Sequence, residues 1–490
     1  MIVWVIMTGH LAVLMTIGWL GIRARKSGAE DFFLAGRRQG WFVTAFTIMA
    51  TFFSAFALMG TPGMVFQFGL PFILFSLNVP IAAAMIRIVG NRVRLLSHQH
   101  ELVTPSDFIC HYFPSRLLNF LVCLIGFLYV LPYIVLQIKA GGYLFDVITD
   151  GQVNRKWGAV ILACVTMIYV HLGGMRSVAL TDVYQGILLL GGMIWGGVVT
   201  VDAVGENFFQ KIAESGEAFL TVPGQGGFFS IPMLLTFTLI APIGSMLSPA
   251  QWLRYNAARS SGDLSRAALI FAVCLTAAYL FGIMLVGLGG KVLLPDLANA
   301  DEVFIRIVKI YLPLWASTLF MVSIIAAAMS TADSNLHALG AILAKDFYKG
   351  LLRKSAGQKE VLAVSHVVIF VTTMLALFIV LFVESLPMLV RLGIVSMAFC
   401  LQLLPVVADI LWFKRGTAVA AIAGILSGLA VLIPLAISAG VPQNPLGVHY
   451  GFWALVANVL VYVVFSYLIP RKEPQRSTRL TRVEAVNRIN

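Results

Sequence analysis

Side chains that bind hard cations are concentrated in one apolar segment of this chain. Residues 321–348, MVSIIAAAMSTADSNLHALGAILAKDFY, are long and apolar enough to cross a membrane. The centre of the segment nevertheless carries Ser330, Thr331, Asp333 and Ser334. Hydroxyl and carboxylate oxygens are ligands for hard cations and not for zinc or copper. Such groups are costly inside a membrane unless they face a cavity, a partner or an ion.

A helical arrangement gathers most of these groups on one side of the segment. Residues three, four or seven apart share a helix face, which here brings together Ala327, Ser330, Asp333, Ser334 and His337. For a single hydroxyl, a hydrogen bond to a backbone carbonyl of the membrane helix is the simpler interpretation. With Asp333 and Ser334 on the same face, we predict that the segment handles an ion.

The composition identifies the setting as a membrane. The chain has 490 residues, of which 59% are hydrophobic and 11% charged, whereas soluble domains carry roughly 25% charged residues. We predict an all-α integral membrane protein with about thirteen transmembrane helices. The apolar runs are about 2–22, 41–66, 70–91, 117–147, 157–172, 178–203, 227–250, 267–293, 311–344, 361–383, 386–413, 417–439 and 450–470. The first run begins without a basic residue or a cleavage site, so we expect it to be retained.

The distribution of positive charge predicts how the chain crosses the bilayer. If the N-terminus lies outside, 26 of the 34 basic residues, Arg254 among them, fall in cytoplasmic segments. This asymmetry is typical of the positive-inside rule and predicts an external N-terminus and a cytoplasmic C-terminus. The net charge of +12 is therefore explained by topology, and we expect the lipid bilayer, not nucleic acid, as the partner. The predicted location is the plasma membrane.

Two predicted spans are interrupted by proline and glycine. The second contains GTPG at 60–63, and the seventh contains APIGS at 241–245 followed by Ser248-Pro249. Both sites favour unwinding. The two spans are five helices apart and so cross in opposite directions, which is typical of an inverted-repeat transporter. The predicted parts are a leading helix at 1–22, repeats at 41–203 and 227–413, two further helices at 417–470, and a basic cytoplasmic tail at 471–490.

Four stretches resemble the sodium:solute symporter family in order and spacing. They are DFFLAGRRQG (31–40), ATFFSAFALMGTPGMVFQFGL (50–70), GGMRSVALTDVYQG (173–186) and AAAMSTADSNLHALGAILAKDFY (326–348). The resemblance runs from about residue 2 to 415. It implies a ten-helix inverted-repeat core of the LeuT type, with broken first and sixth core helices and extra flanking helices.

The resemblance also implies a sodium site between the first and eighth core helices. Ala50 and Phe53 would supply backbone carbonyls from the broken helix, and Ala327 a third carbonyl. Ser330 and Thr331 would add their hydroxyls. Five oxygens without formal charge suit a monovalent ion that must also leave.

Some members of the family have a second sodium site, which corresponds here to Asp182, Ser330, Asp333 and Ser334. Two neighbouring carboxylates disfavour joint ionisation unless a cation lies between them. The pair Asp182 and Asp333 is therefore predicted to bind a second sodium ion or to carry a proton. Alternatively, Asp182 is a helix-end residue beside Arg176.

The predicted solute contacts lie on the first and third core helices. Placing the charged side chain of Lys139, in the fourth span, inside a membrane costs free energy. Three explanations remain open: the side chain snorkels to the surface, pairs with a carboxylate, or binds an anionic substrate. The surrounding LPYIVLQIKAGG resembles the branch that carries monocarboxylates. We expect Lys139 to hold an anionic solute, with Thr51, Ser54 and Gln137 orienting it.

Together these features predict a sodium-coupled symporter that takes up a small organic solute, such as a monocarboxylate, by alternating access. Sodium is the expected coupling ion, without an organic cofactor or an obligatory protein partner. The alternatives are a proton-coupled transporter of the same fold and a membrane sensor module. An enzyme is not expected, because no catalytic cluster of paired His and Asp residues is apparent at a membrane surface.

Overall fold

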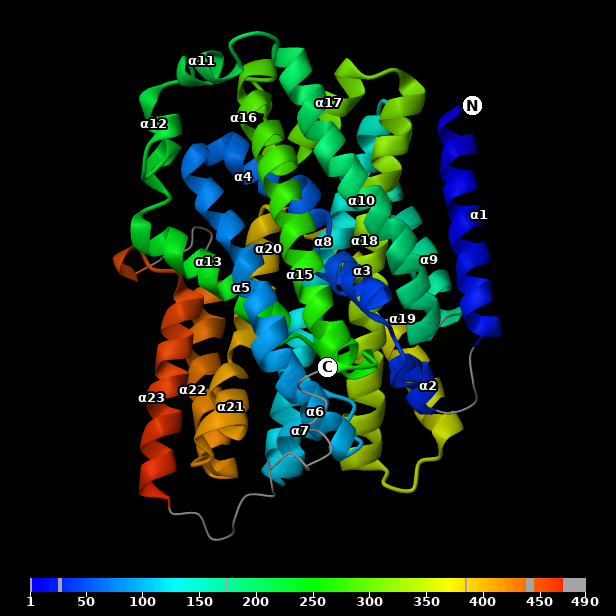
Figure 1. Ribbon diagram of the computed structural model, residues 1–490, viewed down its shortest axis with the longest axis vertical. Helices are drawn as coiled ribbons and strands as arrows, with labels where there is room; N and C mark the ends of the chain where they lie inside the picture. The colour runs from blue at the N-terminus through cyan, green and yellow to red at the C-terminus, as the bar shows by residue number, and fades with distance from the viewer. Residues whose placement is uncertain (1, 25–28, 173, 384–385, 438–444, 470–490) are drawn as a thin grey trace.

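The computed structural model describes residues 2–24, 29–172, 174–383, 386–437 and 445–469, and these residues form a helical bundle (Figure 1). Within them, nine helices are long and apolar enough to cross a membrane, or up to twelve if each bent pair is one span. The prediction of an all-helical membrane protein is confirmed for this part of the chain. The predicted basic tail at 471–490 lies outside the described residues.

Within the described residues, each of the thirteen predicted segments is mainly helical. The long helices and continuous helical runs are α1 (Ile2–Arg23), Leu70–Gln99 with α5 (Asn78–Met85) and α6 (Asn91–Gln99), α8 (Arg116–Ile148), α9 (Arg155–Leu172), α10 (Met175–Val204), α15 (Ser261–Ala278) with α16 (Met284–Leu293), α18 (Leu314–Ala341), α19 (Gln358–Phe382), α22 (Ala418–Ile437) and α23 (Tyr450–Leu468). The bent pairs are α3 (Trp41–Phe52) with Phe56–Phe68, α13 (Ile231–Met246) with α14 (Pro249–Ala257), and α20 (Leu389–Leu401) with Leu404–Phe413. Shorter helices include α2 (Ala29–Leu34), α7 (Pro105–Tyr112), α11 (Phe208–Ala213), α12 (Glu217–Leu220) and α17 (Val303–Tyr311). The number of true spans, their direction across a membrane and the division into two repeats stay predictions.

The first broken helix bends earlier than the sequence predicts. The 57° bend lies between α3 and Phe56–Phe68, and Phe53 there has extended backbone angles of φ −98° and ψ 103°. Residues 60–63, where we expected unwinding, are helical instead. The Thr61 amide bonds to the Phe56 carbonyl in a π-helical turn, and this wider turn lets the helix pass Pro62, which has no amide hydrogen.

The second broken helix also continues past its predicted unwinding site. α13 runs through Pro242 to Met246, and the 54° bend follows it. The prediction that residues 241–245 unwind is therefore wrong. The Ser248-Pro249 pair does lie at the interruption, because the next helix begins at Pro249. The Ser248 hydroxyl accepts from the Gln251 amide at 3.4 Å and caps α14. Gly244 allows α13 to pack closely on α20, because a Cβ at this position would meet the backbone of Met397.

α18 is the most enclosed long helix among those described. In its most apolar window 83% of residues are buried, compared with 22% for α1 and for α23. It packs on α3, α8, α10, α14 and α19. In Figure 1, α1 lies at one edge of the bundle and α22 and α23 at the other. The polar face that the sequence predicts on this segment is thus directed at other helices and not at lipid.

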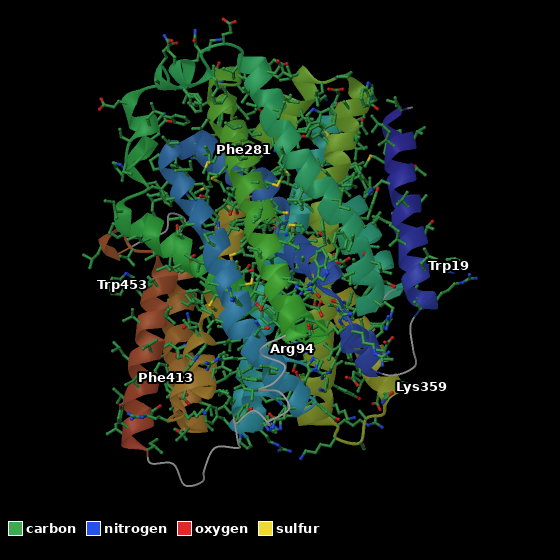
Figure 2. The ribbon with its side chains drawn as sticks, in the orientation of Figure 1. Trp19, Arg94, Phe281, Lys359, Phe413 and Trp453 are labelled. Carbon is green, nitrogen blue, oxygen red and sulfur yellow. The ribbon has the colours of Figure 1, made fainter. Side chains whose placement is uncertain are left out.

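Close helix contacts give a test of this packing. A Cβ at Gly197 in α10 would meet the backbone carbonyl of Phe281, a residue labelled in Figure 2, whereas a Cβ at Gly191 would meet nothing within 4 Å. Gly197→Ala should therefore destabilise the protein by about 1–3 kcal/mol through overpacking. Its melting temperature in detergent should fall by several degrees, while Gly191→Ala on the same helix should match the parent. Equal melting of the two variants would contradict the packing of α10.

Candidate functional site

Oxygen atoms from α3 and α18 converge where α3 ends. The Ser330 hydroxyl donates to the Ala50 carbonyl at 3.1 Å, and the Thr331 hydroxyl donates to the same carbonyl at 3.0 Å. Ser330 also lies 3.1 Å from the carbonyl of Ala327. All four residues are fully buried. Four of the five residues of the predicted sodium site are therefore brought together.

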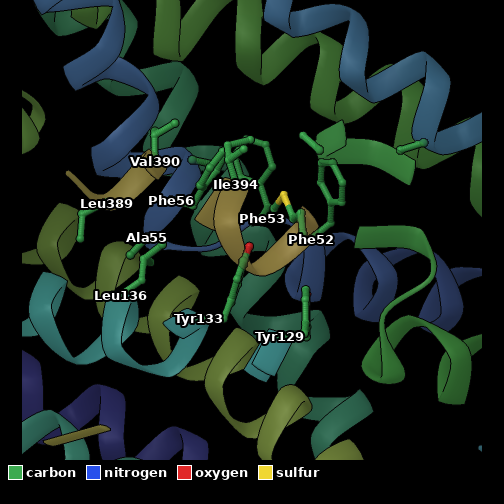
Figure 3. Close-up of a cluster of buried hydrophobic side chains, with 14 of the residues drawn as sticks. Phe52, Phe53, Ala55, Phe56, Tyr129, Tyr133, Leu136, Leu389, Val390 and Ile394 are labelled. Atoms are coloured by element: carbon green, nitrogen blue, oxygen red, sulfur yellow. The ribbon is translucent and has the colours of Figure 1, made fainter. Parts of the chain in front are cut away.

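The fifth residue, Phe53, lies at the break itself. The amides of Ala57 and Leu58 both donate to the Ser54 carbonyl. In a continuous helix the Ala57 amide would bond to the Phe53 carbonyl, so the break withdraws that partner. The Phe53 ring is buried edge-on against Tyr279, with ring centroids 5.4 Å apart, within the apolar cluster shown in Figure 3. This packing fixes the turn that follows Ala50.

Side chains from α8 contact the chain just after the break. The Ala55 amide donates to Gln137 Oε1 at 3.2 Å, and the hydroxyls of Ser54 and Tyr133 lie 3.3 Å apart. In Figure 3, Tyr133 projects from α8 toward this turn. Gln137 is fully buried, and its Nε2 has no hydrogen-bond partner among the described residues. Two of the predicted solute contacts, Ser54 and Gln137, thus lie at one turn with a free amide donor.

Thr51 contributes to a different part of the site. Its hydroxyl donates to the Thr47 carbonyl at 2.8 Å and lies 3.3 Å from the Ser334 hydroxyl. This places Thr51 beside the acidic cluster formed by Asp182 of α10 and Asp333 of α18, two residues before the break at Phe53. Ser334 in turn donates to Asp333 Oδ1 at 3.1 Å.

A residue that the sequence analysis missed lies within that acidic cluster. Arg254 in α14 donates to Asp182 Oδ2 at 3.2 Å and also to the Ser334 hydroxyl. The Thr47 hydroxyl bonds to the same Asp182 oxygen. Asp182 and Asp333 are fully buried, and Arg254 is 1% exposed. The two carboxyl groups and the guanidinium therefore form one enclosed polar cluster.

The sequence analysis placed Arg254 in a cytoplasmic segment, which stays a prediction, and it did not anticipate that the side chain is enclosed by protein. Every residue of α14 is buried. Trp252, Leu253 and Tyr255 around Arg254 were the available signal, because a solvated loop rarely carries so many large apolar residues. The alternative placing Asp182 beside Arg176 is wrong, since Arg176 pairs with Asp31 at 2.7 Å.

Lys139 is held away from this site by its own partners. Its ammonium donates to the carbonyls of Leu386 and Pro387 at 3.3 and 2.7 Å, and Asp301 Oδ2 lies 4.0 Å from it. Asp301 also accepts from the Leu389 amide at 3.1 Å. Burial raises the pKa of the Asp301 carboxyl, and the Lys139 charge opposes that rise. The contacts favour carboxylate pairing among the three explanations for Lys139.

This pairing can be tested with a double-mutant cycle. Lys139→Met and Asp301→Asn should each lower the free energy of unfolding by about 1–3 kcal/mol, because each leaves a buried partner unmatched. The double variant should lose less than the sum of the two. Arg353→Gln, which removes an ion pair whose arginine side chain is 60% exposed, should leave the stability close to that of the parent, because solvent screens exposed pairs. Additive losses for Lys139 and Asp301 would rule out the pairing.

Comparisons with known proteins bear on the whole bundle. A family model described as the sodium:solute symporter family matches residues 32–428. The chain is 25% identical to the sodium/pantothenate symporter of Haemophilus influenzae over 94% of each chain. It is 28% identical to the sodium/proline symporter of Escherichia coli, over 86% of this chain and 85% of that one.

One solved structure has closely similar architecture. It is a sodium-coupled sialic acid symporter in a substrate-bound, outward-open state, which superposes with a TM-score of 0.81 at 20% identity. The match covers 97% of this chain and 99% of that one. At this identity the likeness concerns the fold, which is the LeuT-type arrangement that the resemblance implied.

Proposed function

The chain belongs to the sodium:solute symporter family, and we propose that it couples the inward movement of sodium to uptake of a small carboxylate-bearing organic solute. Family membership makes it a transporter and not an enzyme. It also argues against the sensor-module alternative. The bacterial relatives and the external N-terminus predicted from the charge pattern support uptake across a plasma membrane.

The observation that carries this proposal is the meeting of two α18 hydroxyls at the Ala50 carbonyl. A sodium ion requires several oxygens, and neutral ones hold it weakly enough for release. Ser330, Thr331 and the carbonyls of Ala50, Ala327 and Phe53 form such a set. Because the ligands come from α3 and α18, an ion bound there would join the two helices. Its departure would free them to separate.

The solute is proposed to bind beside the break in α3. Pantothenate, proline and sialic acid, the solutes named for the relatives and the similar structure, all carry a carboxylate. The unpartnered Gln137 Nε2 can donate to such a group. Ser54 and Tyr133 can add neutral hydrogen bonds. Lys139 is not part of this proposal, because its ammonium is engaged elsewhere.

Proton coupling is the second candidate. It is favoured by one observation: Asp182 Oδ1 and Asp333 Oδ2 are buried and have no hydrogen-bond partner among the described residues. A proton could satisfy either oxygen. Uptake measured with a sodium gradient alone and with a proton gradient alone separates the two candidates.

The sodium site predicts a specific defect. Ser330→Ala combined with Thr331→Ala should weaken apparent sodium affinity about a hundredfold, since two bonds to a charged group at roughly 1.5 kcal/mol each are lost. Uptake into proteoliposomes at varied external sodium measures this. Ser323→Ala is the matched control, because Ser323 is a buried serine of α18 whose hydroxyl bonds within its own helix. Unchanged sodium affinity in the double variant would refute the site.

The solute site predicts a change in selectivity. Gln137→Glu retains an oxygen for the Ala55 amide but replaces the free amide donor with an acceptor. Carboxylate solutes should then bind at least about tenfold more weakly, because two acidic groups repel each other. Pantothenate, proline and their neutral amide analogues serve as probes, and sodium binding without solute is the control. An equal loss for acids and amides would argue against carboxylate recognition by Gln137.

A further inference from the structure

A cavity of about 610 Å³ lies between α8, α13, α20, α22 and α23. Helices α22 and α23 form one edge of the bundle in Figure 1, so the cavity is near the rim of the molecule. Among the described residues that line it, only Arg391, His449 and Tyr450 carry polar side-chain atoms. The volume is within the range of small-molecule sites, which is roughly 300–1,000 Å³. The cavity is therefore suited to a largely apolar ligand with a few polar groups.

Helix α20 separates this cavity from the candidate sodium and solute sites. Gly393 faces the break in α3, because a Cβ there would meet the ring of Phe56. Arg391 and Val395, each two residues from Gly393, line the cavity instead. Side chains two residues apart on a helix do not face the same way. The cavity and the proposed sodium site therefore lie on different sides of α20.

Arg391 brings a positive charge to the cavity without an acidic partner. Its guanidinium carbon lies 5.4 Å from the centre of the Phe228 ring. Its Nε is buried and has no hydrogen-bond partner, and Arg391 forms no ion pair within the part of the chain that the structure describes. Lys139 of α8, by contrast, is matched by the Pro387 carbonyl and by Asp301. Because an unmatched charge in a membrane protein costs free energy, the cavity favours an anionic ligand.

Two further polar groups lie at the end of the cavity where α20 and α23 begin. Tyr450 is close enough to Arg391 to interact with it electrostatically, and its ring centroid lies 4.1 Å from that of His449. The Gly451 amide donates to His449 Nδ1 at 3.1 Å. In the neutral imidazole the proton is then on Nε2, which can donate a hydrogen bond. One end of the cavity thus combines a cation with neutral donors.

The rest of the cavity is apolar and extends along α20. Val395 and Phe399 follow Arg391 by four and eight residues and also line the cavity, which carries its wall about 12 Å along the helix. The hydrocarbon part of one leaflet is roughly 15 Å thick, half of a bilayer core. The charge pattern of the sequence predicts that α20 begins at the external surface. A ligand with an anionic head at Arg391 and an apolar chain beside Phe399 would match this cavity in charge and length.

We propose that this cavity binds an anionic phospholipid of the outer leaflet, with its phosphate at Arg391 and one acyl chain between α8, α20 and α22. Basic pockets between membrane helices bind the head groups of anionic lipids in this way. The bound chain fills the space between α22 and the helices that carry the transport site. The inference goes beyond the proposed function, because it concerns a ligand that is not transported.

Native mass spectrometry of the purified full-length protein tests the inference with two lipids that have the same chains. One dioleoyl phosphatidylglycerol should bind at least about tenfold more tightly than dioleoyl phosphatidylcholine, because only the first has a net charge to match Arg391. Equal binding of the two lipids would overturn the inference. Displacement of the lipid by an equal concentration of glycerol phosphate, which has no chain, would overturn it. Displacement by an equal concentration of oleate would assign the cavity to fatty acids and overturn it as well.

Variants locate the bound lipid. Arg391→Gln should remove the preference for phosphatidylglycerol, whereas Arg306→Gln should keep it, because Arg306 is already paired with Glu302. Ala436→Trp fills the cavity from α22 and should weaken both lipids at least about tenfold, whereas Val419→Trp, at a position of the same helix that is 46% exposed, should weaken neither. A folded Arg391→Gln protein with an unchanged preference would contradict the site. If that variant does not fold, parent-like lipid binding by Ala436→Trp overturns the proposal.

Discussion

The break in α3 is the constraint on which the site depends. Backbone groups released inside a membrane protein require partners, because no water is available to bond them. Here the partners come from other helices: α18 hydroxyls bond to the Ala50 carbonyl, and α8 Gln137 accepts from the Ala55 amide. The break is therefore maintained by α8 and α18. An ion or a solute can compete for these groups, because each is a single hydrogen bond and not a closed backbone ladder.

Fixed charges organise the regions on either side of this break. Arg254 joins α3, α10, α14 and α18 around two carboxyl groups. Lys139 of α8 contacts Asp301 and the chain before α20. Removing one member of such a pair leaves an unmatched charge in a poorly solvated position. The resulting loss of folding free energy is far larger than the net contribution of the intact pair to stability. The pairs thus specify which helices meet, and they leave the oxygens of the proposed sodium site without a fixed positive charge beside them.

Much of the helical content was predictable from the sequence, because long apolar runs have few alternatives. The polar face of α18 was also predictable, since Ser330, Thr331 and Asp333 are conspicuous in an apolar segment. The position of the first break was not. Proline indicates a weak point, but the π-helical turn before Pro62 absorbs it, and the extended backbone at Phe53 carries no local signal.

The burial of charged side chains was the least predictable feature, because it depends on partners distant in the chain. Arg254 meets Asp182 and Ser334, 72 and 80 residues away, and Lys139 meets Pro387, 248 residues away. Neither pairing is marked by spacing or periodicity. The large apolar residues around Arg254 indicate that it is enclosed, but they do not indicate which acids it meets. The sequence could therefore identify the acids of the cluster but not the arginine that joins them.

The difference between an exchangeable ion and a fixed one determines what a gradient can drive. A cation that binds and leaves stabilises only the states in which its ligands converge, so its binding and that of the solute reinforce each other reciprocally. The Arg254 charge is present in every state, loaded or empty, and can transmit no energy from a gradient. Each exchangeable sodium ion driven by a tenfold gradient supplies about 1.4 kcal/mol, which corresponds to roughly tenfold accumulation of the solute where no membrane potential acts.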